Sequence, residues 1–70
     1  MDKPIKYMTI TVESYPFGWE QKYFYMEVKS GLQIGDVIRH KNGKQFRIID
    51  GKTHLDVKDI DLDTYQLFEE

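Results

Sequence analysis

Cysteine is absent from this 70-residue chain, which excludes disulfides, thiol nucleophiles and thiolate metal ligands. Small secreted domains usually depend on disulfides, so the composition favours a reducing, cytoplasmic setting. No apolar run approaches the roughly 18 residues of a membrane span. The N-terminal residues also lack the continuous apolar region of a signal peptide. We therefore expect a cytoplasmic protein without a membrane partner.

Side chains that carry catalysis or hold metals are scarce as well. The only histidines are His40 and His54, too few for a zinc site. The segment Asp59–Asp63 has aspartates at alternate positions, as a calcium loop does, but Thr64 stands where such a loop needs glycine. The sequence contains no nucleophile elbow and no phosphate-binding glycine loop. We expect a non-enzymatic protein that binds no cofactor and no metal.

Charge is distributed unevenly along the chain, although its net value is only −2. Residues 1–49 hold eight Lys or Arg against five Asp or Glu, giving +3, and residues 50–70 hold two against seven, giving −5. The folded molecule therefore has two faces of opposite charge unless folding interleaves these residues. The acidic tail Asp56–Glu70 is interpreted as a solvated edge, with a surface for a basic partner as the alternative.

Two alternating segments predict a first pair of antiparallel strands, at Ile5–Val12 and Lys22–Lys29. The side chains predicted to face the core are Met8, Ile10, Val12, Phe24, Met26 and Val28. Between the strands, Glu13–Gln21 contains Pro16 and Gly18 and is predicted to form a turn or a protruding loop.

A β-hairpin is the strongest local signal in the chain. Strands at Asp36–His40 and Lys44–Ile49 flank Asn42-Gly43, a dipeptide typical of a type I′ turn. Its predicted core residues are Ile38, Phe46 and Ile48, with Gln45 and Arg47 outside. The sequence Asp50-Gly51-Lys52 is predicted to form a further turn.

The C-terminal third is less regular. Leu55 and Val57 share one parity whereas Ile60 and Leu62 have the other, which predicts a bulge, a bend or a short 3₁₀ turn between them. A final segment, Thr64–Phe68, is predicted as a strand, with a short helix as the alternative. Together these elements predict one all-β domain over residues 1–70, a small five- or six-stranded SH3-like barrel or strongly bent antiparallel sheet.

The run Ile34–Ile38, IGDVI, followed by Asn42–Ile48, NGKQFRI, resembles a recurring hairpin of SH3-like barrels. It is most similar to the N-terminal KOW-like domain of the elongation factor P family. There a Gly-Asp-apolar strand, a glycine turn and an aromatic-x-apolar strand follow one another. The resemblance covers Leu32–Asp50 and implies a fold. That family continues with a basic, glycine-rich loop, whereas this chain becomes acidic, so no functional residue is carried over.

A cluster of aromatic residues forms the first candidate surface. Its members are Tyr15, Phe17, Trp19, Tyr23 and Tyr25. Tryptophan and tyrosine are frequent anchors of protein interfaces, and exposed rings also bind proline-rich peptides or stack on bases. The alternative for Phe17 and Trp19 is a loop that folds back and caps an open end of the barrel.

Basic residues around the hairpin tip form the second candidate surface. They are Arg39, His40, Lys41, Lys44 and Arg47. A cationic β-ribbon could follow a phosphate backbone and bind RNA or DNA with salt-dependent affinity. The alternative is a solvated hairpin whose charges prevent edge-to-edge pairing.

These features give three functional hypotheses. The first is a non-catalytic module that binds a protein partner through the aromatic residues; by analogy, it looks like the small accessory or inhibitor proteins of phages and mobile elements. The second is an RNA- or DNA-binding barrel that uses the basic hairpin. The third is a self-associating structural subunit, so the chain is expected to be a monomer or a weak homo-oligomer.

Overall fold

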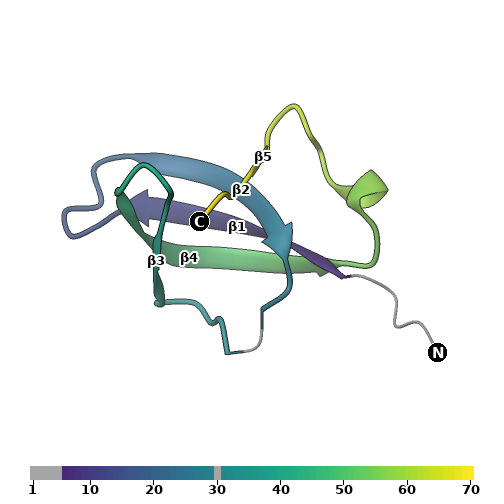
Figure 1. Cartoon of the computed structure of the whole chain (residues 1–70), viewed down its shortest axis with the longest axis horizontal. Coiled ribbons are helices and arrows are strands. Elements are labelled where there is room, and N and C mark those ends of the chain that lie inside the picture. The colour runs from purple at the N-terminus through teal and green to yellow at the C-terminus, as the bar shows by residue number, and fades with distance from the viewer. Residues whose placement is uncertain (1–5, 30) are drawn as a thin grey trace.

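Five strands form one strongly curled sheet, a half-barrel (Figure 1). The computed structural model describes residues 6–29 and 31–70. The sheet has the order β3-β4-β1-β2-β5, and a 3₁₀ turn, η1, is the only helical turn within the described residues. The elements are β1 Tyr7–Ser14, β2 Gln21–Glu27, β3 Val37–Arg39, β4 Gln45–His54, η1 Val57–Asp59 and β5 Gln66–Leu67. The predicted all-β fold with five strands is confirmed.

The first predicted strand pair is confirmed as the antiparallel hairpin β1–β2, with Ile10 opposite Phe24. β1 extends to Ser14, two residues beyond the prediction, and the predicted start at Ile5 lies outside the described residues. Val28 is 44% exposed, so its predicted core position is wrong. The pairing with β1 ends at Glu27, and Val28 therefore lies beyond the buried face.

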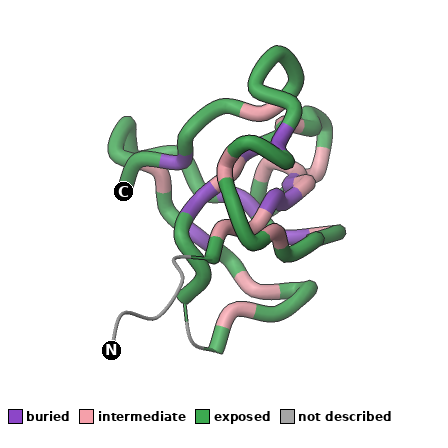
Figure 2. The backbone as a smooth tube through the Cα atoms, turned by 90° about the vertical axis from the view of Figure 1, so that its right-hand side faces the viewer, coloured by how far each residue is buried: buried purple, intermediate pink, exposed green. Residues whose placement is uncertain are grey.

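One face of the sheet carries the hydrophobic core. Figure 2 shows the buried segments gathered in the middle of the molecule, with exposed loops around them. The core residues are Ile10, Val12, Phe24, Met26, Ile38, Phe46, Ile48 and Phe68. Seven of these eight were predicted from strand alternation, because period-2 patterning places every second side chain on the same face.

The predicted hairpin is confirmed as β3–β4, with Ile38 opposite Phe46, and both residues face the core as predicted. The predicted type I′ turn is wrong, because that turn needs positive φ at both central residues and only Gly43 has it here, at 89°. The Gly43 N–H donates to the His40 carbonyl over 2.8 Å, and the Asn42 side chain accepts from the Lys44 N–H over 2.9 Å. The result is a longer loop that ends on a left-handed glycine.

We expect Gly43→Val to lower the free energy of unfolding by about 1–2 kcal/mol, because a β-branched residue is strained in the left-handed region. An added Cβ would have no heavy atom within 4 Å, so the loss would come from the backbone alone. Urea unfolding measures it. Gly43→Asn is the control and should lose less, since asparagine tolerates positive φ. Equal losses in the two variants would contradict this explanation.

β4 passes straight through the segment that was predicted as a turn. Asp50, Gly51 and Lys52 belong to this ten-residue strand. Val12 pairs with Ile48 and Thr11 with Asp50, so one residue of β4 is inserted as a bulge. The bulge reverses the alternation of side chains. As a consequence, Asp50, Lys52 and His54 lie on the face opposite the core.

The C-terminal segment crosses to the far edge of the sheet. The 3₁₀ turn η1 confirms the irregularity predicted from the change of parity. The predicted final strand is confirmed as β5, but it pairs with β2 in parallel rather than antiparallel orientation. Phe68 follows β5 and inserts into the core, and the Lys41 N–H donates to the Glu69 carbonyl over 2.8 Å. These contacts join the end of the chain to the tip of the β3–β4 hairpin.

Candidate functional site

The loop between β1 and β2, residues Tyr15–Glu20, is the aromatic loop. Hydrogen bonds to Ser14 at the end of β1 hold it in place. The Ser14 hydroxyl accepts from the N–H groups of Trp19 and Glu20 over 3.1 and 3.3 Å, and the Ser14 carbonyl accepts from the Gly18 N–H over 2.6 Å. Serine is suited to this role, since its short side chain readily bonds to nearby backbone. The loop therefore has a defined backbone conformation although it lies at the surface.

Two rings of this loop point into solvent. Phe17 is 81% exposed and Trp19 is 83% exposed, while Tyr15 is 44% exposed. The ring centroids of Phe17 and Trp19 lie 6.4 Å apart with an interplanar angle of 59°. The alternative in which these two rings fold back as a barrel cap is therefore not observed.

The aromatic loop and the tip of the basic hairpin lie side by side. The Tyr15 N–H donates to the Gln45 carbonyl over 3.0 Å, which ties the loop to the start of β4. Between them is a groove of about 320 Å³ whose lining includes Tyr15, Trp19, Lys44 and Phe46. The structure thus brings part of each predicted surface to one end of the molecule.

Two of the predicted basic residues are paired with carboxylates. Arg47 donates from Nε to Glu13 Oε1 over 2.9 Å, and its second guanidinium nitrogen contacts the same oxygen. Lys41 forms an ion pair with Glu69. The hydrogen bond and the positive charge of Lys41 lower the pKa of the Glu69 carboxyl below its usual value. These pairs reduce the positive charge that the hairpin offers to a ligand.

The other three basic residues have different surroundings. His40 packs against the rings of Phe24 and Phe68, with centroid distances of 5.7 and 5.5 Å, and so belongs to the closure of the half-barrel. Arg39 and Lys44 are exposed and form no ion pair with any described carboxylate. Of the five predicted residues, only Lys44 lines the groove beside Trp19.

The remaining two predicted tyrosines lie on the sheet rather than in the aromatic loop. Tyr23 is 42% exposed and packs edge-on against Tyr65, with ring centroids 5.8 Å apart. Tyr25 is partly buried where β2 meets β5. The predicted aromatic surface is therefore divided between the aromatic loop and the C-terminal segment.

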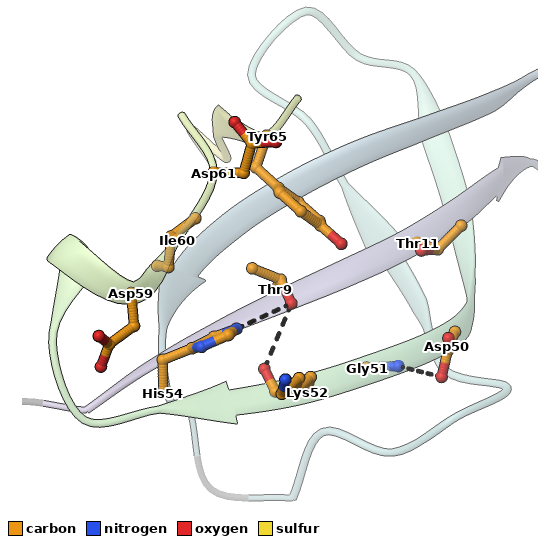
Figure 3. A pocket seen from close by; sticks show the side chains of 10 residues that line it. All are labelled: Thr9, Thr11, Asp50, Gly51, Lys52, His54, Asp59, Ile60, Asp61 and Tyr65. Atoms are coloured by element: carbon orange, nitrogen blue, oxygen red, sulfur yellow. Dashed lines mark hydrogen bonds between the residues drawn. The ribbon is translucent and has the colours of Figure 1, made fainter. Parts of the chain in front are cut away.

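A polar groove of about 290 Å³ lies on the face of the sheet opposite the core (Figure 3). Its floor includes Thr9, which is only 4% exposed, donates from its hydroxyl to the Lys52 carbonyl over 3.5 Å and lies 3.3 Å from His54 Nε2. Figure 3 shows Tyr65 reaching over β1 with its hydroxyl directed toward Thr11. Sequence reasoning missed this groove. Its signal was the alternation Asp50, Lys52, His54, which has meaning only once the register with β1 is known.

An apolar groove of about 530 Å³ lies where β1 begins, β2 ends and β5 passes. Its apolar lining comes from Tyr7, Tyr25, Met26, Val57, Leu67 and Phe68. Leu67 is 50% exposed, whereas Phe68 is almost fully buried and also belongs to the core.

No family model matches the chain, and neither a curated protein nor a solved structure was found to be similar to it.

Two further observations limit the chemistry of these surfaces. Among residues 6–29 and 31–70, no cluster of three or more histidine, aspartate or glutamate side chains is arranged to hold a metal ion. In the same part of the chain, no helix has the length and apolar character that crossing a membrane requires.

Proposed function

We propose that this chain is a non-catalytic binding module that contacts a protein partner through the aromatic loop. The observation that carries the proposal is the exposure of Phe17 and Trp19, both above 80%, on a loop whose backbone is hydrogen-bonded in place. An inhibitor-type accessory protein is one form that such a module takes.

Large exposed rings are costly for a protein that has no use for them. Phe, Tyr and Trp each bury roughly 150–250 Å² when they pack, and tryptophan and tyrosine dominate the energetics of protein interfaces. The Ser14 hydrogen bonds fix the backbone of the aromatic loop before binding, so less conformational entropy is lost when a partner docks. These properties are those of an interface anchor.

The charges around the aromatic loop favour protein over nucleic acid. Nucleic-acid sites depend on several unpaired cations that can displace counterions from phosphates. Here Arg47 is paired with Glu13, Lys41 is paired with Glu69, and Lys22 is paired with Glu20 over 3.4 Å. Lys44 is the one basic side chain that lines the groove beside Trp19, and a single cation binds a phosphate backbone only weakly.

An affinity capture from the source cells with three bait proteins tests the proposal. The wild-type chain should retain a specific protein, and Trp19→Ala should lose at least about nine-tenths of it, because anchor residues contribute about 2 kcal/mol or more. Ile34→Ala is the matched control, since Ile34 is an apolar residue 68% exposed outside the aromatic loop. It should retain the protein at the wild-type level.

Two outcomes would contradict the proposal. One is retention of the same proteins by wild type and Trp19→Ala. The other is binding of a mixed-sequence oligonucleotide that weakens steeply between about 50 and 200 mM salt, which would assign the surface to nucleic acid. Circular dichroism of each bait confirms that the compared proteins are folded.

A further inference from the structure

The aromatic loop and the apolar groove lie at opposite ends of β1. Tyr7 opens this strand and lines the groove, while Ser14 closes it and holds the aromatic loop. Eight residues of strand span about 25 Å. In Figure 1 the β1–β2 loop and the start of β1 are correspondingly far apart. One molecule therefore has an exposed pair of rings at one end and an open apolar groove at the other.

The charges beside these two features are complementary. Lys44, which has no ion pair with a described carboxylate, borders Trp19. At the groove, Lys29 is paired with Glu70, and Glu27 forms no ion pair with a described cation. Among the described residues, the groove beside the rings thus has one cation without an ion pair, Lys44, and the apolar groove has one carboxylate without an ion pair, Glu27.

We propose that the apolar groove of one copy of this chain binds Phe17 and Trp19 of a second copy. This inference rests on the proposed function, because it identifies the protein partner of the aromatic loop as another molecule of the same chain. The groove volume of about 530 Å³ accommodates aromatic side chains, and its apolar wall removes their rings from water. Lys44 then approaches the carboxylates at the edge of the groove.

Such a contact joins two different surfaces and is therefore heterologous. The pair formed by one contact still has one free aromatic loop and one free groove, so growth continues into a ring or an open chain of molecules. Two rings and their surroundings bury less than the roughly 800 Å² per partner of a standard interface, so a single contact is weak. The association is consequently expected at high protein concentration.

Sedimentation velocity from about 10 μM to about 1 mM protein tests this arrangement. The wild-type chain should sediment faster as concentration rises, and Trp19→Ala should reduce the association constant about tenfold or more. Leu67→Lys should reduce the association constant to a similar extent, because it places a cation in the groove. Leu62→Lys is its matched control, because Leu62 is 57% exposed and does not line the groove, and it should associate like wild type.

Mixing the two defective variants separates this contact from a symmetric one. Trp19→Ala retains an intact groove and Leu67→Lys retains intact rings, so an equimolar mixture should form dimers at a concentration where each variant alone is monomeric. The emission of Trp19, the single tryptophan, should shift to shorter wavelength in that mixture. Self-association of Leu67→Lys alone would overturn the proposal, since it would place ring against ring.

A wild-type chain that remains monomeric up to about 1 mM would also overturn the inference. The proposed function is judged separately by the capture experiment, run with bait at about 1 mM so that a weakly bound second copy of the chain is also retained. A monomeric chain that still loses its captured protein on Trp19→Ala would leave the aromatic loop as a binding surface and reject only the second copy as its occupant.

Discussion

Phe46→Ala is expected to unfold the chain at 25 °C. Phe46 is 2% exposed, stands opposite Ile38 in the β3–β4 hairpin and packs against Phe24 with ring centroids 5.7 Å apart. Removing a buried phenylalanine ring costs about 3–5 kcal/mol. A single core in a domain of this size supplies only about 3–5 kcal/mol of stability. The cost therefore equals the whole stability of the fold, and circular dichroism with thermal scanning should show no cooperative transition.

Phe17→Ala is the matched control, because the same substitution is made at a ring that is 81% exposed. Its free energy of unfolding should stay within about 0.5 kcal/mol of wild type, as is usual for surface positions without special contacts. If Phe46→Ala unfolds cooperatively with a midpoint similar to that of the wild-type chain, the core is not centred on this residue. Unfolding of Phe17→Ala would show that the aromatic loop supports the fold.

The hairpin of β3 and β4 could be predicted because its signals are local. Alternation placed Ile38 and Phe46 on one face, and these two residues lie opposite each other in the structure. The turn type depended on a competing local contact, in which the Asn42 side chain accepts from the Lys44 N–H. That bond is compatible with negative φ at Asn42, so the type I′ turn that Asn-Gly usually forms is not adopted.

The fate of the basic residues could not be predicted, because their partners come from distant parts of the chain. Glu13 pairs with Arg47 across 34 positions of sequence, and Glu69 reaches Lys41 only after the C-terminal segment has crossed the sheet. No periodicity within the hairpin contains this information. The prediction that the segment around Phe17 is a loop depended on proline and glycine, but the conformation of its backbone depends on hydrogen bonds to Ser14.

The bulge in β4 explains why the polar groove was missed. Gly51 was interpreted as a turn residue, yet it lies opposite Ile10 within a strand, where a Cβ would meet the Thr9 carbonyl at 3.6 Å. A glycine in a strand interior often marks a bulge or a close approach of two backbones. Only the pairing of β4 with β1 distinguishes this case from a turn, and that pairing joins residues about 40 positions apart.

Phe68→Ala is expected to lower the free energy of unfolding by about 3–5 kcal/mol, because its buried ring belongs to the hydrophobic core. Its ring is 6% exposed and packs edge-on against Phe24 and His40, with centroids 5.4 and 5.5 Å away. Its N–H donates to the Tyr25 carbonyl over 2.8 Å. This hydrogen bond and the packing of the ring tie the segment after β5 to the sheet.

Phe68→Leu makes this effect measurable if Phe68→Ala does not fold. A leucine refills part of the space, so its loss should be nearer 1–2 kcal/mol, within the range of urea unfolding. Leu67→Ala is the control, because Leu67 is 50% exposed and should lose much less than Phe68→Ala. Equal losses at residues 67 and 68 would show that β5, rather than the inserted ring, closes the half-barrel.

Phe68→Leu should also change the surroundings of the aromatic loop. Phe68 supports His40, His40 begins the turn that carries Lys44, and Lys44 lines the groove beside Trp19. Amide chemical shifts of residues 40–44 and 15–20 in folded Phe68→Leu should therefore change together. The amide chemical shifts of η1 should stay as in the wild-type chain. Changes confined to β5 would show that the C-terminal closure and the candidate binding surface are independent.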